Sequence, residues 1–139
     1  MTSSTEILNK KSKRDRKNIA LASSDNALDK TLMILFQHDY HIFTIDLNSR
    51  LGSSLTDKTI DLLIIDVKSI DKENLKRISL LKKLYSNLPI IMLYDLKIPH
   101  HIKSDLFQFA DVMFRKPFSN LQLMNAVDNF LKESDAAKS

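Results

Sequence analysis

The strongest constraint on the fold is the alternation of short apolar runs with stretches of helical periodicity. Two of the runs, DLLIID (61–66) and PIIMLY (89–94), contain at least four consecutive large apolar residues. A strand with such a sequence is typically buried on both faces, as the strands of parallel sheets are. Runs at 18–22, 41–45 and 111–115 have a similar length. We therefore expect these five segments to form β-strands.

The segments between the runs have the spacing of amphipathic helices, with apolar residues three or four positions apart. One helix should begin near Asn26, and another should end before Pro89, because the residue before a proline avoids helical geometry. Further helices are expected at 49–58, around 99–108, and after Ser119 or Asn120, either of which can cap a helix N-terminus. The expected inward faces are Leu28, Leu32, Leu35 and Phe36; Leu75, Ile78, Leu81 and Tyr85; and Leu121, Met124, Val127 and Leu131.

Strands that alternate with helices predict an α/β fold of the (βα)5 type, with a doubly wound parallel five-stranded sheet. Ligands of such sheets gather outside the carboxyl ends of the strands. Asp66 is the last residue of the run 61–66, so we expect its carboxylate at that edge. The only glycine is Gly52, which excludes the glycine-rich phosphate loops of most nucleotide-binding α/β proteins.

Composition excludes several other classes. The 139 residues suit one domain, and no apolar run approaches the roughly 20 residues that cross a bilayer. We expect no secretory signal, because the N-terminal residues contain no apolar segment of 7–15 residues. The absence of cysteine excludes disulfides and thiolate metal sites and fits a cytoplasmic location. The four histidines lack the spacing of zinc ligands.

The net charge of +4 is concentrated in residues 1–17, which hold six basic and two acidic residues. The remaining 15 basic and 15 acidic residues cancel. We expect 1–17 to be a flexible basic tail, 18–134 the folded domain, and 135–139 a C-terminal end or the start of a linker. The segment KKSKRDRK (10–17) could attract nucleic acid or an anionic membrane. Because no aromatic residues interleave it and no helix-turn-helix follows, we expect a solvated leader and no nucleic-acid partner.

Polar residues follow four of the expected strands and should therefore meet at the carboxyl edge of the sheet. They are Ser23, Ser24 and Asp25; Asp66; Tyr94 and Asp95; and Lys116. Asp66 and Lys116 should face each other there. A structural ion pair and a functional pair both fit these two residues.

Two motifs resemble those of one protein family. IDLLIIDV (60–67) is similar to the PDLIILDV of response-regulator receiver domains, and FADVMFRKPFSNLQL (109–123) is similar to their GADDYLTKPFDPEEL. The resemblance covers about Lys17 to Glu133 and implies the flavodoxin-like receiver architecture of two-component signalling. It implies that Asp66 is the phosphoacceptor, that Lys116 is its charge partner, and that the proline after Lys116 is cis.

The resemblance also implies a Mg²⁺ site, and here the sequence departs from the family. Receivers hold the metal with the acceptor aspartate, an acidic pair after the first strand, and a backbone carbonyl, here that of Lys68. The acidic pair falls on Ser23 and Ser24, which are neutral, so Asp25 and Asp66 are the only candidate carboxylate ligands. Losing two anionic ligands removes a few kcal/mol of attraction, on the order of the Coulomb energy at an effective dielectric near 20.

The two switch positions of the family are substituted as well. Tyr94 stands where receivers have a Ser or Thr that binds the phosphoryl group, and Met113 where many have a Tyr or Phe. Asp95 follows Tyr94 and could oppose a phosphoryl group, and the ammonium of Lys68 could fill the cation position.

Two functions remain open. The first is an atypical receiver that acts through protein contacts, with weak or no phosphorylation of Asp66, and that is not otherwise an enzyme. The alternative is a Mg²⁺-dependent phosphoacceptor switched by a histidine kinase. Either implies a signalling partner (a kinase, a phosphotransferase or a downstream effector). The resemblance places a possible homodimer surface across Ile98–Glu133, which includes His100 and His101.

Overall fold

The computed structural model describes residues 16–46, 59–67, 72–95, 104–106 and 108–138. The expected helix at 49–58 lies outside the described residues. The tail up to residue 15 and Lys68 lie outside them as well. Of the expected helix at 99–108, residues 104–106 are described as helical and residue 108 as part of a turn.

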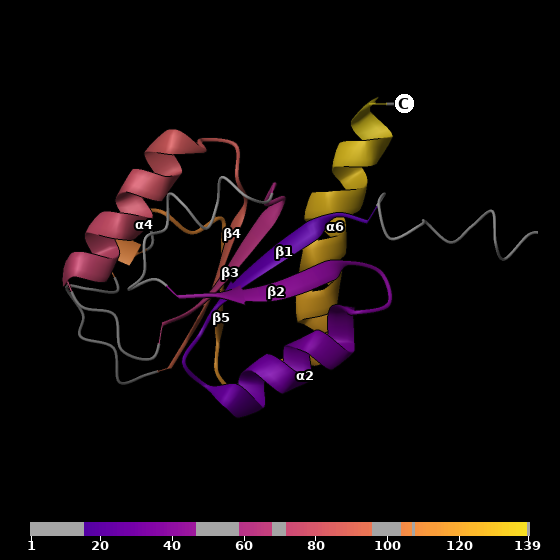
Figure 1. Ribbon diagram of the computed structural model, residues 1–139, viewed down its shortest axis with the longest axis horizontal. Coiled ribbons are helices and arrows are strands. Elements are labelled where there is room, and N and C mark those ends of the chain that lie inside the picture. The colour runs from indigo at the N-terminus through magenta and orange to yellow at the C-terminus, as the bar shows by residue number, and fades with distance from the viewer. Residues whose placement is uncertain (1–15, 47–58, 68–71, 96–103, 107, 139) are drawn as a thin grey trace, which may run out of the picture.

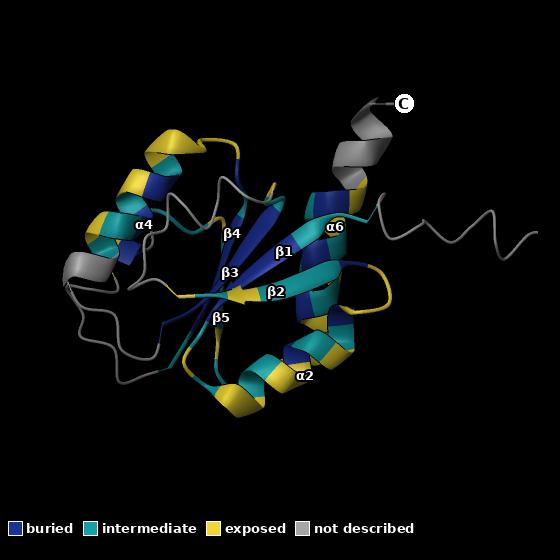
Figure 2. Cartoon of the chain, viewed as in Figure 1, coloured by how far each residue is buried: buried dark blue, intermediate teal, exposed yellow. Residues whose placement is uncertain are grey.

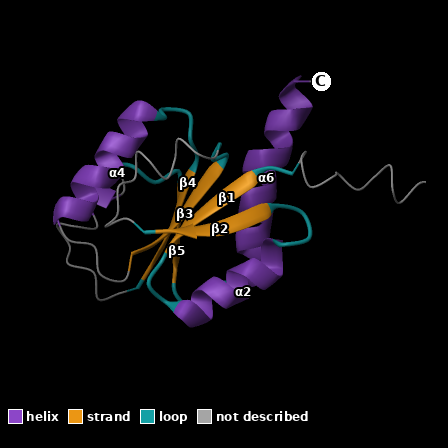
Figure 3. Cartoon of the chain, viewed as in Figure 1, coloured by secondary structure: helices purple, strands orange, loops and turns teal. Residues whose placement is uncertain are grey.

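The described strands form one parallel sheet (Figure 3). Their order is β2-β1-β3-β4-β5, so the order reverses beside β1, which lies between β2 and β3. Every neighbouring pair is parallel. The strands are β1 (Asn18–Ala22), β2 (His41–Ile45), β3 (Leu62–Val67), β4 (Ile90–Tyr94) and β5 (Val112–Arg115). This arrangement confirms the α/β class with a doubly wound, flavodoxin-like five-stranded parallel sheet.

Helices cover both faces of the sheet (Figure 1). They are α2 (Asn26–Phe36), α4 (Lys72–Leu84) and α6 (Asn120–Lys138). Two apolar clusters fill the space between sheet and helices. The first lies between the sheet and α4 and includes Ile65, Ile78 and Leu81; the second lies between the sheet and α2 with α6.

The central strand explains why the sheet is covered on both sides. All six residues of β3 are buried, and the strand is dark blue in Figure 2. Its apolar side chains alternate between the two clusters. Leu63, Ile65 and Val67 pack on the side of α4, whereas Leu62 and Ile64 pack on the side of α2 and α6. Because side chains alternate along a strand, Asp66 lies on the α2 and α6 side.

Three details of the sequence prediction were wrong. Asp66 is not the last residue of its strand, because β3 continues through Val67, which pairs with Tyr94. Tyr85 lies just beyond the end of α4, and Leu121 is 66% exposed. The buried leucine at the start of α6 is Leu123, which with Val127 and Leu131 follows a spacing of four residues.

No helix in the part of the chain that the structure describes is both long and apolar enough to span a membrane.

Candidate functional site

The candidate site lies where β1, β3 and β5 end, at the carboxyl edge of the sheet. Asp66 comes from β3, and Lys116 follows directly after β5. Because β4 separates those strands, the long side chain of Lys116 has to cross one strand to reach Asp66. The backbone N–H of Lys116 is fixed by the carbonyl oxygen of Tyr94 at 2.7 Å, and the Lys116–Pro117 peptide bond is cis, as the motif predicted.

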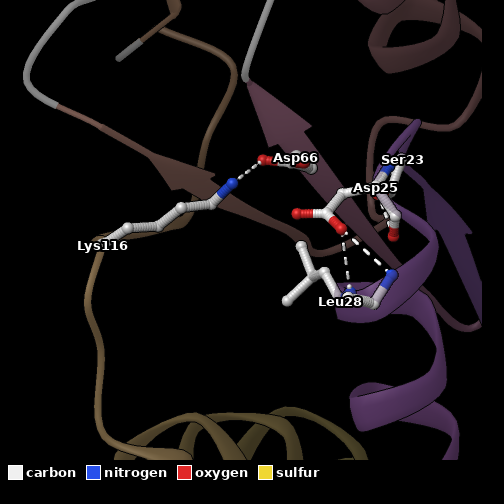
Figure 4. A network of polar contacts seen from close by, with 6 residues as sticks. Ser23, Asp25, Leu28, Asp66 and Lys116 are labelled. Atoms are coloured by element: carbon white, nitrogen blue, oxygen red, sulfur yellow. Dashed lines mark hydrogen bonds and ion pairs between the residues drawn. The ribbon is translucent and has the colours of Figure 1, made fainter.

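The ammonium of Lys116 donates a hydrogen bond to Oδ1 of Asp66 (Figure 4). The side chain of Asp66 is 0% exposed and that of Lys116 is 23% exposed. A carboxylate removed from water needs a cation and hydrogen bonds to offset its desolvation. Lys116 supplies the cation, so the sequence prediction that these two residues meet agrees with the structure.

The second carboxylate oxygen of Asp66 differs from the first in its hydrogen bonding. Oδ2 is buried and has no hydrogen-bond partner among the described residues. A buried oxygen without a partner costs about 1–3 kcal/mol, more for a charged group, and such an atom needs a structural or functional explanation. The site therefore combines one neutralised carboxylate oxygen with one that is buried and has no hydrogen-bond partner among the described residues.

The side chain of Asp25 forms hydrogen bonds at the N-terminus of α2. Its Oδ1 accepts the backbone N–H groups of Ala27 at 3.0 Å and Leu28 at 3.2 Å, which makes it the N-cap of the helix. The backbone N–H of Asp25 in turn donates to Oγ of Ser23 at 3.0 Å. Figure 4 shows the other carboxylate oxygen of Asp25 pointing toward the pair of Asp66 and Lys116.

The N-cap role of Asp25 was missed by the sequence reading, which considered this residue only as a metal ligand. The signal was present, because an aspartate directly before a helical pattern is a strong capping residue. Of the two serines expected in the acidic-pair positions, Ser23 is half-buried and forms the turn that leads into Asp25, whereas Ser24 is exposed.

The two substituted switch positions lie on the other side of the sheet from α2 and α6. Tyr94 ends β4 and Met113 belongs to β5, and both are half-buried against the apolar cluster under α4. Asp66 lies on the α2 and α6 side of β3. The packing of Tyr94 and Met113 is thus part of the core beneath α4.

A metal ion would need several oxygen ligands at this edge. Among the described residues, no group of three or more His, Asp or Glu side chains could hold one. Asp66 bonds to a lysine, and one oxygen of Asp25 is used by the helix cap. The described side chains therefore do not form a set that fits Mg²⁺. The carbonyl of Lys68, the remaining ligand that the resemblance implied, lies outside the described residues, so the absence of a metal stays a prediction.

Several solved structures share this fold. A pilus assembly-related protein from Burkholderia pseudomallei is 21% identical, with a TM-score of 0.65 over 82% of this chain and 88% of that one. A response regulator receiver domain protein from Clostridium thermocellum is 17% identical, with a TM-score of 0.70 over 87% of this chain and 98% of that one. NtrX from Brucella abortus is 17% identical with a TM-score of 0.70; the match covers 88% of this chain and only 28% of that one.

No protein-family model and no curated protein sequence matches the chain. The structural neighbours therefore establish the fold. The chemistry of the site has to be inferred from the residues of this chain. That fold is the one of response-regulator receiver domains.

Proposed function

We propose that this chain, which has the fold of a response-regulator receiver domain, is an atypical receiver of two-component signalling that acts through protein contacts. In this proposal Asp66 is phosphorylated weakly or not at all, and the chain is not an enzyme beyond that. Its partner is a signalling protein, such as a histidine kinase, a phosphotransferase or a downstream effector. A cytoplasmic location, and a homodimer through the surface Ile98–Glu133, belong to the same proposal.

The observation that carries the proposal is the ion pair of Asp66 and Lys116. The carboxylate is fully buried, and its counter-ion is an ammonium group of the same chain. A receiver that depends on Mg²⁺ keeps a cluster of carboxylates whose repulsion the metal relieves. With serines at positions 23 and 24, that repulsion is missing, so no metal is needed to relieve it.

The helix cap supports the same conclusion. Asp25 follows the end of β1, and one of its oxygens accepts two backbone N–H groups of α2. Taking that oxygen for a metal ligand would release both N–H groups and cost about 1 kcal/mol of helix stability.

The alternative function is a Mg²⁺-dependent phosphoacceptor at Asp66, and one observation favours it. Oδ2 of Asp66 is buried without a described partner, and the second oxygen of Asp25 points toward the site. In this alternative Asp25, Asp66 and the Lys68 carbonyl hold the metal. Metal binding decides between the two functions, since a millimolar or tighter dissociation constant would favour the phosphoacceptor.

The test is incubation of the whole chain with Mg²⁺ and acetyl phosphate, followed by intact-protein mass spectrometry. The carboxylate of Asp66 would attack phosphorus, acetate would leave, and an aspartyl phosphate would form. We expect little or no phosphorylated protein, at the level of the Asp66→Asn control. Stoichiometric phosphorylation that Asp66→Asn abolishes would overturn the proposal.

A second variant tests whether the two serines are the reason for the missing phosphorylation. Ser23→Asp combined with Ser24→Asp restores the two missing carboxylates, and we expect this variant to bind Mg²⁺ and to gain phosphorylation. If phosphorylation stays absent in the restored variant although its folded structure is intact, the serines are not the reason for its absence. Asp25→Asn keeps the capping oxygen and removes the charge, so it should not change the wild-type result.

A further inference from the structure

The outer face of α4 presents an apolar strip. Leu80 is 57% exposed and Leu84 is 65% exposed, and Tyr85, directly after the helix, is 40% exposed. Residues four apart lie on one face of a helix, so Leu80 and Leu84 are neighbours on the surface. Figure 2 shows exposed positions on the outer side of α4, which lies across the sheet from α2 and α6. Contiguous exposed apolar groups of this kind mark interaction sites more often than isolated ones do.

Two hollows adjoin this strip. One of about 410 Å³ lies beside Leu80, and another of about 600 Å³ lies beside Leu84 and Tyr85. The lining of the first includes Leu75, Lys76, Lys83, Asp105 and Phe109. The lining of the second combines apolar residues with polar ones, namely Leu88, Pro89, Phe130 and Leu131 with Lys17, Asp61, Ser86 and Asn87. A partner that places apolar side chains into both hollows would cover the strip between them.

The charge of α4 indicates which partner fits. Its sequence KENLKRISLLKKL holds five basic residues and one acidic residue, a net charge of +4. Residues 18–139 are neutral as a whole, so the basic excess of α4 is local. Lys82 is already bonded to Asp111 and to the carbonyl of Leu88, whereas Lys76 and Lys83 are exposed beside the first hollow.

We infer that the strip on α4 docks an acidic amphipathic helix of a partner protein. Its apolar side chains would enter the two hollows, and its carboxylates would face Lys76 and Lys83. This is the helix-in-groove mode of recognition, in which apolar anchors supply affinity and complementary charge supplies specificity. The inference goes beyond the proposed function, because it holds whether or not Asp66 is phosphorylated.

Two other occupants fit less well. A second copy that packs α4 against α4 would bring two helices of net charge +4 together, which is unfavourable. A flat anionic membrane would meet the lysines but would leave the two hollows unfilled. Both remain distinguishable outcomes of the experiment.

The experiment selects helical peptides from a random display library on the whole chain and then measures the binding of the selected peptides by fluorescence anisotropy. We expect acidic peptides with leucines at helical spacing. Leu80→Ser and Leu84→Ser should each weaken binding about tenfold or more, as loss of an apolar anchor does. Lys83→Glu should weaken it as well and reduce its dependence on salt.

The matched controls are Ile34→Ser on α2 and Leu121→Ser on α6, because both residues are 66% exposed aliphatic side chains outside the strip. These variants should bind the peptides as the wild type does. Circular dichroism confirms that every variant is folded.

Three results would overturn the inference. The first is a failed or different selection: the library yields no binding peptide, or the selected peptides are not acidic, or their affinity does not change in the Leu80 and Leu84 variants. The second is binding to phosphatidylserine vesicles that Leu84→Ser abolishes while the peptides do not compete, which would assign the strip to a membrane. The third is self-association in sedimentation that Leu84→Ser abolishes, which would assign it to a second copy.

Discussion

At the scale of single residues, Asp66 shows how an aliphatic strand can contain a carboxylate. The strand carries it into the interior, where the side chain is fully buried, and a lysine from after β5 reaches over β4 to neutralise it. The pair is asymmetric, because the side chain of Lys116 is 23% exposed to solvent whereas that of Asp66 is 0% exposed. Removing either partner should therefore have unequal consequences.

Lys116→Met should destabilise the fold by about 3–5 kcal/mol, because it removes the ammonium that neutralises a buried carboxylate. Asp66→Asn should cost less, about 1–2 kcal/mol, because the buried group is then neutral and only its amide lacks hydrogen-bond partners. Urea unfolding followed by circular dichroism measures both.

The double variant Asp66→Leu with Lys116→Met is the control for this prediction. Replacing both partners by apolar groups removes the unpaired charge, so most of the loss caused by Lys116→Met should be recovered. Equal destabilisation by Lys116→Met and Asp66→Asn would contradict the prediction and would indicate that the pair is solvated.

At the scale of elements, the five strands could be predicted nearly to the residue. Parallel strands buried on both faces have near-continuous apolar sequences, which stand out from the helical stretches around them. The boundary of β3 was the exception. A carboxylate looked like the end of the strand, but its pairing with β4 continues through Val67, because Lys116 makes a buried Asp66 tolerable.

The inner face of α6 shows a limit of periodicity. A spacing of three or four residues allows both Leu121 and Leu123 to be placed inward, depending on where the helix is taken to begin. Ser119 accepts the backbone N–H of Gln122 at 3.2 Å, and from that start Leu123 falls inward and Leu121 outward. Only packing against the sheet decides between such alternatives.

The two leucines of α6 give a direct test. Leu123 is 0% exposed and Leu121 is 66% exposed. Leu123→Ala should lower the free energy of unfolding by about 2–5 kcal/mol, because it leaves a cavity in the core. Leu121→Ala should change it by less than about 0.5 kcal/mol, as substitutions of exposed residues usually do. A comparable loss for both in thermal or urea unfolding would contradict the orientation of α6.

The sequence predicted which residues lie at the candidate site, but it did not predict most of the contacts that they make. Residues that follow parallel strands share one edge of the sheet, which was enough to bring Asp66, Lys116 and Asp25 together. The sequence could not show that one oxygen of Asp25 is used by the cap of α2, or that Oδ2 of Asp66 is buried without a described partner. Those facts depend on side-chain directions that only the folded structure fixes.

At the scale of the whole molecule, the site joins segments that are distant in the sequence. The ends of β1, β3 and β5 meet only in the folded sheet, so any ligand held between them binds the native state and not the unfolded chain. Such a ligand stabilises the entire fold by RT ln(1 + [L]/Kd). The stability of the whole domain is therefore a measure of metal binding at its carboxyl edge.

On the proposed function, Mg²⁺ should leave the stability of the wild-type chain unchanged. A true site with Mg²⁺ present at a hundredfold excess over Kd would raise the free energy of unfolding by about 2.7 kcal/mol, which urea unfolding resolves easily. Sodium chloride at matched ionic strength controls for general screening of surface charge.

The variant with Ser23→Asp and Ser24→Asp should behave in the opposite way. Without metal it should be less stable than the wild type, because three carboxylates then lie close to Asp66, and Mg²⁺ should restore the lost stability. Stabilisation of the wild type by Mg²⁺ that Asp66→Asn removes would mean that Lys116 yields its place to a metal, and the contact-only function would then be wrong.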